Sequence, residues 1–321
     1  MKRVVISLAI ILLASPLAHS DMDATRVTLR DHVLKLINRD RQLYGLPPVQ
    51  LDLDASAAGD QYCREQIRTG TNGHYGIDGI PPYMRYSLAG GNDGVSENAA
   101  AWSATYAFSD RALYEMARRS EDAMMGETAP NDGHKKTILD PHATHVGIGL
   151  AWERGEFRLV HEFVRRYVKW ARPLPRHANL ADTVIASARP LDNAKVEAIS
   201  VHFEKAPQAM PATVANSIDS YSLPSNRKDY LPRLRQDYSR QANGTIEIVR
   251  REYSDGRRGD FYVGKDGEFS FTIPFTEGPG VYTVVVWVRR GGTGVPIAAS
   301  NVSIRVDGTA AMPVRASAAS R

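Results

Sequence analysis

Four polar residues in the first half of the chain have the types expected of a chemical site. They are His74 in "NGHYG", Glu97 in "SENAA", Glu127 in "MMGET" and His134 in "DGHKKTIL". Neutral histidine offers a nitrogen lone pair, and two carboxylates would balance the charge of a divalent cation. Without a cation or protons, two converging glutamates would repel each other and one pKa would rise. Spacing alone does not show that the four converge, but their chemistry suits Zn²⁺, Mg²⁺ or Ca²⁺.

Three other histidines have contexts that favour structural roles. His142 stands in a predicted turn beside a proline, and His145 opens a predicted strand. His161 alternates with apolar neighbours on one face of a predicted strand, which indicates a partly buried histidine with satisfied hydrogen bonds.

Three of the four candidate site residues also have a plainer interpretation. His74 could be an exposed loop residue, and Glu127 could be a surface acid at a helix end. Glu97 could cap a following helix through backbone N–H groups. Cys63 is the only cysteine, so no intramolecular disulfide can form, and we predict a small buried helix residue there.

The elements that must position these residues are helices followed by a hairpin. The alternating runs "THVGIGLAW" and "FRLVHEFV", joined by a turn at 153–156, predict two antiparallel strands. Helices combined with late strands indicate a layered domain that ends near Trp170. Apolar spacing and end signals predict helices over 24–44, 55–68 and 110–125, with a short helical turn near 83–88.

The pattern changes after a Pro-bearing stretch, 171–190, which we interpret as a linker. Short alternating runs follow, among them "VEAISVHFE", "VYTVVVWVR" and "SNVSIRV". They predict an all-β sandwich of the immunoglobulin or fibronectin type over 191–308. The interval 205–242 has weaker patterning, in which strands cannot be placed. We interpret Asn243-Gly244 as a hairpin turn and 309–321 as a disordered tail.

The N-terminus has the pattern of a secretory signal. "MKRVVISLAIILLASPLAHS" combines Lys2 and Arg3, an apolar run, and small residues at its end. The apolar run is shorter than the roughly 20 residues that a spanning helix needs. We therefore predict a signal peptide over 1–20, no transmembrane anchor after cleavage, and a secreted or periplasmic protein. The formal net charge of +4 is too small to predict nucleic acid as a partner.

Five motifs in order carry a family resemblance: "LINRDRQLYGLPPVQLDLDASAAGDQYC", "GHYGIDGIPPYMRY", "GVSENAAAW", "EDAMMGE" and "GHKKTILDPHATHVGIGLA". Over residues 28–168 the chain resembles the bacterial branch of the CAP superfamily. This is the SCP domain shared by cysteine-rich secretory proteins, antigen 5 and plant pathogenesis-related proteins. The resemblance implies an α+β fold, in which an α/β/α sandwich over 25–170 carries a cleft lined by His74, Glu97, Glu127 and His134.

The sequence departs from that family's pattern at two points. Met124-Met125-Gly126 precedes Glu127, where the family usually has an aromatic helix end. Ser96 stands where glycine usually precedes the Glu-Asn pair. The disulfides of the eukaryotic members are absent, and the resemblance does not extend to the C-terminal sandwich.

Three functions are open on these grounds, and we favour the first. The resemblance implies a secreted binding module whose cleft holds a divalent metal and a lipid, cell-wall or protein ligand. A metal-dependent hydrolase, peptidase or nuclease, would use Glu97 or Glu127 as its base, and Glu97 and His134 are the catalytic candidates. The chain lacks a His-Glu-x-x-His helix and a Gly-x-Ser-x-Gly elbow, which argues against that function. A purely structural or adhesive protein is the third alternative.

Overall fold

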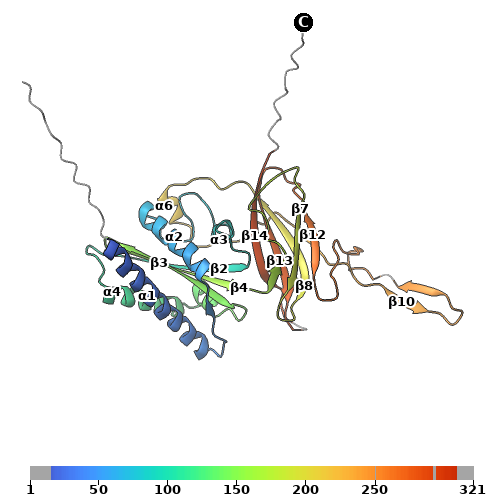
Figure 1. The fold of residues 1–321 in the computed structure, drawn as a ribbon, viewed down its shortest axis with the longest axis horizontal. Coiled ribbons are helices and arrows are strands. Elements are labelled where there is room, and N and C mark those ends of the chain that lie inside the picture. Colours follow the sequence, from blue (N-terminus) through green and yellow to red (C-terminus); the bar gives the residue numbers. More distant parts are fainter. Residues whose placement is uncertain (1–15, 250, 292–293, 309–321) are drawn as a thin grey trace, which may run out of the picture.

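The computed structural model describes residues 16–249, 251–291 and 294–308, which form two domains packed against each other (Figure 1). The N-terminal domain combines a sheet with helices, and the regular elements described in the C-terminal domain are strands apart from a short helix at 212–215. The predicted tail, 309–321, lies outside the described residues, as does the predicted signal peptide apart from 16–20, which begin the first helix. Among the described helices, none is both long and apolar enough to cross a membrane.

The N-terminal domain is built on a four-stranded sheet of order β1-β3-β4-β2. The predicted hairpin is present as β3 and β4, which are antiparallel, and β1 lies parallel to β3. Strand β2 pairs antiparallel with β4 at the opposite edge, and the sequence analysis did not predict it. Glu97 lies within β2, so its interpretation as a helix cap is wrong. The bounds are β1 Gln50–Leu51, β2 Gly94–Ser103, β3 His145–Glu153 and β4 Glu156–Arg165.

Helices cover both faces of this sheet. The long α1 and α4 pack on one face, and α2 packs on the other (Figure 1). Helix α2 begins where the Asp52 carboxylate accepts the N–H of Ala55, and it ends at Gly70 in the left-handed conformation. The four predicted helical segments are present as α1 Pro16–Leu43, α2 Leu53–Thr69, α3 Pro82–Leu88 and α4 Asp110–Met125, and a further short helix is α5 Gly133–Ile138.

The alternation of glycine with apolar residues in β3 has a packing reason. Ile148 and Leu150 are fully buried against α1 and α4. Gly147 and Gly149 face α2, and a Cβ on Gly149 would lie 2.3 Å from the carbonyl carbon of Gly59. Only glycine permits that approach of helix backbone to strand backbone. The hairpin is therefore the buried middle layer of three.

The C-terminal domain contains a three-stranded sheet, β12-β7-β5, and a five-stranded sheet, β6-β14-β13-β8-β9. One apolar core, including Phe271 of β12 and Val284 of β13, draws on both sheets. The predicted linker 171–190 is wrong, because it contains β6 and β7, and β7 buries alternate residues in that core. The bounds are β5 Val168–Trp170, β6 His177–Asn179, β7 Val184–Pro190, β8 Lys195–Glu204, β9 Arg227–Tyr230, β12 Phe269–Ile273, β13 Gly280–Arg289 and β14 Ile297–Asp307.

A polar interface joins the two domains along β14. The Asn301 side chain accepts the N–H of Val95 at 2.8 Å and donates to the carbonyl of Tyr83 at 3.3 Å. The Ser303 N–H donates to the Ser87 hydroxyl at 2.8 Å. These bonds tie β2 and α3 to the C-terminal sheet, so the second domain helps to hold the elements around Glu97. Asn301 is buried in this role.

The weakly patterned interval after β8 returns to the N-terminal domain. We call residues 205–226, between β8 and β9, the strap; it contains the short helix α6 Ala212–Ala215. The Met210 N–H donates to the carbonyl of Ile77 at 2.8 Å. The Asn216 side chain donates to the carbonyl of Gly70 and accepts the N–H of Asn72, both at 3.0 Å. The strap is thus anchored beside the loop that carries His74.

Candidate functional site

The structure brings the four predicted site residues together as two histidine–glutamate pairs. The Nδ1 atom of His74 lies 2.9 Å from Oε1 of Glu97, and Nδ1 of His134 lies 2.5 Å from Oε1 of Glu127. The centroids of the two imidazole rings are 6.3 Å apart, with 30° between the ring planes. Each ring therefore has one nitrogen held by a carboxylate while the rings approach each other.

Different elements deliver the four side chains to one edge of the sheet. His74 lies in the loop after α2, and Glu97 lies in the edge strand β2. Glu127 follows the end of α4, and its Oε2 accepts the backbone N–H of His134 in α5 at 2.9 Å. Asn98 donates to the carbonyl of His134 at 3.0 Å, which ties α5 to β2. The Glu-Asn motif thus serves both pairs, through adjacent residues on opposite faces of β2.

Arg85, in α3, belongs to the candidate site and was missed in the sequence. Its guanidinium forms an ion pair with Glu97 and donates to the carbonyl of His74 at 3.1 Å. It also lies 3.3 Å from the centroid of the Tyr62 ring, in cation–π contact. Arg85 therefore fixes both members of the first pair. An arginine in the motif "PPYMRY" was the only signal, and nothing local to it indicates a buried carboxylate partner.

Glu162, in β4, is a second missed residue and the cross-strand partner of Glu97. Burial by itself would raise the pKa of Glu97, but the charge of Arg85 and the hydrogen bond from His74 hold that pKa below its ordinary value. Burial and the nearby charge of Glu97 raise the pKa of Glu162 well above its ordinary value. The pKa values of the two neighbouring carboxyl groups are therefore shifted in opposite directions.

The strap closes one side of the site through Tyr221. The Tyr221 ring meets the His74 ring edge to face at 4.9 Å, and its hydroxyl accepts the backbone N–H of Glu97. The His74 and Glu97 side chains are only 10% and 0% exposed, whereas those of His134 and Glu127 are 34% and 22% exposed. The site is therefore closed at the first pair and open to solvent at the second.

Removal of the Tyr221 ring should make His74 accessible. In Tyr221→Ala, we expect faster modification of His74 by diethyl pyrocarbonate, located by peptide mass spectrometry, because the ring no longer covers the imidazole. Tyr221→Phe keeps the ring and should react as slowly as the wild type. Tyr106→Ala, at an exposed position of the same domain, is the matched control. Equal rates in all four proteins would show that Tyr221 does not shield His74.

The two histidines are the side chains that would ligate a divalent cation. Among the residues that the structure describes, no three His, Cys, Asp or Glu side chains stand together as a metal-binding group. The Nδ1 atoms of His74 and His134 face carboxylates, so the Nε2 atoms are the ring nitrogens that would ligate a cation. An ion about 2 Å from one nitrogen of each ring is compatible with the 6.3 Å centroid separation. Glu97 and Glu127 would then orient the imidazoles from behind.

The remaining histidines lie outside this arrangement. His142 lies in a turn, where its N–H donates to Asp140, and Nδ1 of His145 lies 2.9 Å from the Thr144 hydroxyl. His161 is fully buried, and neither ring nitrogen has a partner among the described residues. The prediction that its hydrogen bonds are satisfied is wrong, because its face of β4 packs against α4, where the nearest acid is Glu121 at 4.0 Å.

Comparisons with known proteins give one sequence family and a similar solved structure. The model of the Cysteine-rich secretory protein family, CAP, matches residues 34–160, which include all four site residues. An extracellular protein containing an SCP domain from Bacillus anthracis strain Ames is similar at 16% sequence identity and a TM-score of 0.33, over 42% of this chain and 40% of that one. The chain thus matches about two fifths of that protein's length. No curated protein matches the chain.

Proposed function

From the match of residues 34–160 to the CAP family model, we propose that the chain is a secreted binding module of the CAP superfamily whose histidine–glutamate site holds a divalent cation. One observation carries the proposal: two imidazoles approach each other while each is held at Nδ1 by its own carboxylate. Such carboxylate–histidine pairs are the usual outer support of metal-ligating histidines.

The two carboxylates prepare the rings for metal binding. A glutamate that accepts from Nδ1–H favours the tautomer with a free lone pair on Nε2. Arg85 keeps Glu97 ionised, so the first pair holds this tautomer. The cation would supply positive charge and open coordination positions for an oxygen-bearing ligand. This chain's own contribution is to orient both imidazoles and to close the His74 side with Tyr221.

The open His134 side is where a lipid, cell-wall or protein ligand would approach. Lys136 is exposed nearby, where it pairs with Asp132 at 2.7 Å. The two-sheet C-terminal domain supports an assignment to the immunoglobulin or fibronectin type. In this proposal it serves as an adhesion or spacing domain that also holds the strap over the site.

The same geometry gives less support to a hydrolase. A general base needs a carboxylate that can take a proton from water, with a pKa near the working pH. Glu97 is fully buried, paired with Arg85, and has a lowered pKa. Glu127 accepts from both the backbone and the ring of His134. Both carboxylates are committed to their histidines, which favours binding over proton transfer.

Metal titration tests the proposal directly. The mature chain, stripped with a chelator, is titrated calorimetrically with Zn²⁺, Mg²⁺ and Ca²⁺ in separate runs. We expect saturable binding of one of these ions to the wild type, and at least roughly a hundredfold loss of affinity in His74→Ala/His134→Ala, because both ligating nitrogens are gone.

A matched double variant controls for the loss of imidazoles in general. His142→Ala/His177→Ala removes two histidines outside the site and should bind as the wild type does. Equal affinity in the two double variants would refute the site. Metal-dependent turnover of peptides, nucleic acid or peptidoglycan that is lost in Glu127→Gln would instead support the hydrolase.

A further inference from the structure

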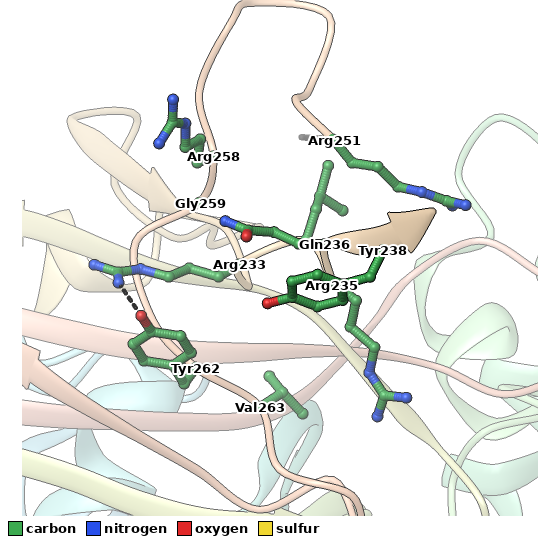
Figure 2. Close-up of a pocket in the computed structure, with 10 residues that line it drawn as sticks. Arg233, Arg235, Gln236, Tyr238, Arg251, Arg258, Gly259, Tyr262 and Val263 are labelled. Carbon is green, nitrogen blue, oxygen red and sulfur yellow. Dashed lines mark hydrogen bonds between the residues drawn. The ribbon is translucent and has the colours of Figure 1, made fainter. Parts of the chain in front are cut away.

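A basic hollow of about 740 Å³ lies in the C-terminal domain, on a different domain from the histidines. It lies at the base of the hairpin formed by β10 (Asp237–Arg240) and β11 (Ile246–Val249). Figure 2 shows guanidinium groups around it, with a hydrogen bond from Arg233 to the hydroxyl of Tyr262. Its lining includes four arginines, two tyrosines and no acid: Arg233, Arg235, Arg251, Arg258, Tyr238 and Tyr262.

The arginines of the hollow are only partly neutralised. Arg251 forms an ion pair with Asp237, and Arg258 lies 3.4 Å from a carboxylate oxygen of Glu252. Arg235 makes no hydrogen bond or ion pair within the described part of the chain. The Arg233 guanidinium lies 4.3 Å from the centroid of the Tyr262 ring, and its hydrogen bond is to the hydroxyl of that tyrosine. The hollow therefore carries excess positive charge that faces solvent.

The neighbouring hairpin exposes an apolar face. Tyr238 pairs with Ile248, and Arg240 pairs with Ile246, so these four side chains share one side of the two-stranded sheet. Tyr238 is 69% exposed, Ile246 is 62% exposed and Ile248 is 47% exposed. Tyr262, beside the hollow, is 70% exposed. Large apolar side chains and unneutralised guanidiniums thus lie side by side on one surface.

The hairpin extends away from the sandwich (Figure 1). Its two strands pair with each other and with neither larger sheet. A two-stranded sheet with an uncovered apolar face is only marginally stable in water, so this surface gains from burial against a partner. The turn between the strands, 241–245, carries no charged residue, so nothing there opposes approach to an apolar boundary.

We propose that the arm, defined as residues 233–249 and 251–262, docks on membranes that contain anionic phospholipids. Guanidinium groups bind phosphate in bidentate fashion, and each basic group near an anionic surface adds to the attraction. Tyrosines favour the headgroup level, and isoleucines favour the acyl boundary. A soluble polyanion would use the arginines but leave Ile246 and Ile248 in water. A bilayer surface satisfies both kinds of side chain at once.

Vesicle sedimentation with the full mature chain tests this docking. One set of vesicles is phosphatidylcholine alone, and the other adds phosphatidylglycerol. We expect binding to the second set only, weakened by salt. Arg233→Gln/Arg235→Gln should lower the affinity about thirtyfold, because two basic groups leave the surface. Ile246→Ser/Ile248→Ser should lower it at least about tenfold.

Matched controls and a soluble probe separate the alternatives. Arg64→Gln/Arg111→Gln removes the same charge from exposed helix positions of the other domain, and Ile185→Ser removes an exposed isoleucine of β7. Both should bind as the wild type does. If Ile246→Ser/Ile248→Ser binds vesicles and soluble polyphosphate as the wild type does, the site is one for soluble polyanions and the proposal fails. A wild-type dimer that this variant dissociates in sedimentation velocity, without vesicle binding by the wild type, would also overturn it.

Discussion

Arg85→Gln is expected to lower the free energy of unfolding by about 3–5 kcal/mol at neutral pH. The substitution removes the guanidinium that neutralises Glu97, which is fully buried and faces a second buried carboxyl group, Glu162. An ionised carboxylate left without a counter-charge in the protein interior is among the costliest single defects. Urea unfolding followed by circular dichroism measures the loss.

The pH dependence of that loss identifies its cause. In the wild type the pKa of Glu97 is lowered, so its stabilising contribution is present above the ordinary value of 4.5 and is lost as pH falls through the folded value. Without Arg85, burial raises the pKa of Glu97. The free energy of unfolding of Arg85→Gln should therefore fall further below that of the wild type at pH 8 than at pH 4. Arg85→Gln/Glu97→Gln should recover part of the loss. If Arg85→Gln is as stable as Arg118→Gln, an exposed control on α4, the buried pair does not support the domain.

Glu121→Gln is expected to gain stability over the wild type as pH rises, by several kcal/mol between about pH 4.5 and pH 8. Burial, together with the charge of Asp40 on α1, raises the pKa of Glu121 from 4.5 to about 8. Arg39, also on α1, opposes this shift, and His161 of β4 faces the same carboxyl group at 4.0 Å. The folded chain therefore holds a proton that the unfolded chain releases above pH 4.5.

The sign of this effect follows from linkage. Because the folded pKa of Glu121 is raised, its contribution is fully present below pH 4.5 and is lost as pH rises through about 8. Glutamine does not titrate, so the variant lacks this loss. Thermal unfolding at a series of pH values measures the difference. Glu153→Gln, at the exposed end of β3, should follow the wild-type profile. Parallel profiles for Glu121→Gln and the wild type would contradict the raised pKa.

His161 determines how stability changes on the acid side of the same pH profile. Burial lowers its pKa from 6.5 to about 3. Below pH 6.5 the His161 imidazole takes up a proton in the unfolded chain but stays neutral in the folded chain. The free energy of unfolding therefore falls between about pH 6.5 and pH 3. That acid loss should persist in Glu121→Gln. The two residues together make the core between α4 and β4 sensitive to pH from both sides.

Much of the N-terminal domain was predictable because its signals are local. Helix periodicity, the cap at Asp52 and the glycines of β3 each arise from a few neighbouring residues. The resemblance to an ordered set of family motifs identified His74 and His134, which the structure places 6.3 Å apart between ring centroids. Strand β2 escaped prediction because it is buried unevenly on both faces and shows no simple alternation.

The net charge of the whole chain did not reveal a local cluster of arginines. A net charge of +4 on 321 residues predicts no polybasic surface, yet four arginines gather around one hollow in the arm. They come from two stretches of chain, 233–235 and 251–258, that the folding of the hairpin brings together. Neither stretch is basic enough alone to stand out in the sequence.

The sequence by itself determined the first four helices, the β3–β4 hairpin and the order of the two domains, and its family resemblance singled out the two histidines and two glutamates of the candidate site. Only the tertiary structure decided that each glutamate holds a histidine at Nδ1. It also decided that Arg85 and Glu162 lie beside Glu97, and that the Tyr221 ring covers the His74 ring. The physical reason is distance along the chain. Local patterns encode elements, but a buried charge chooses its partners among residues such as Tyr221, 124 positions from Glu97, that meet only when both domains have folded.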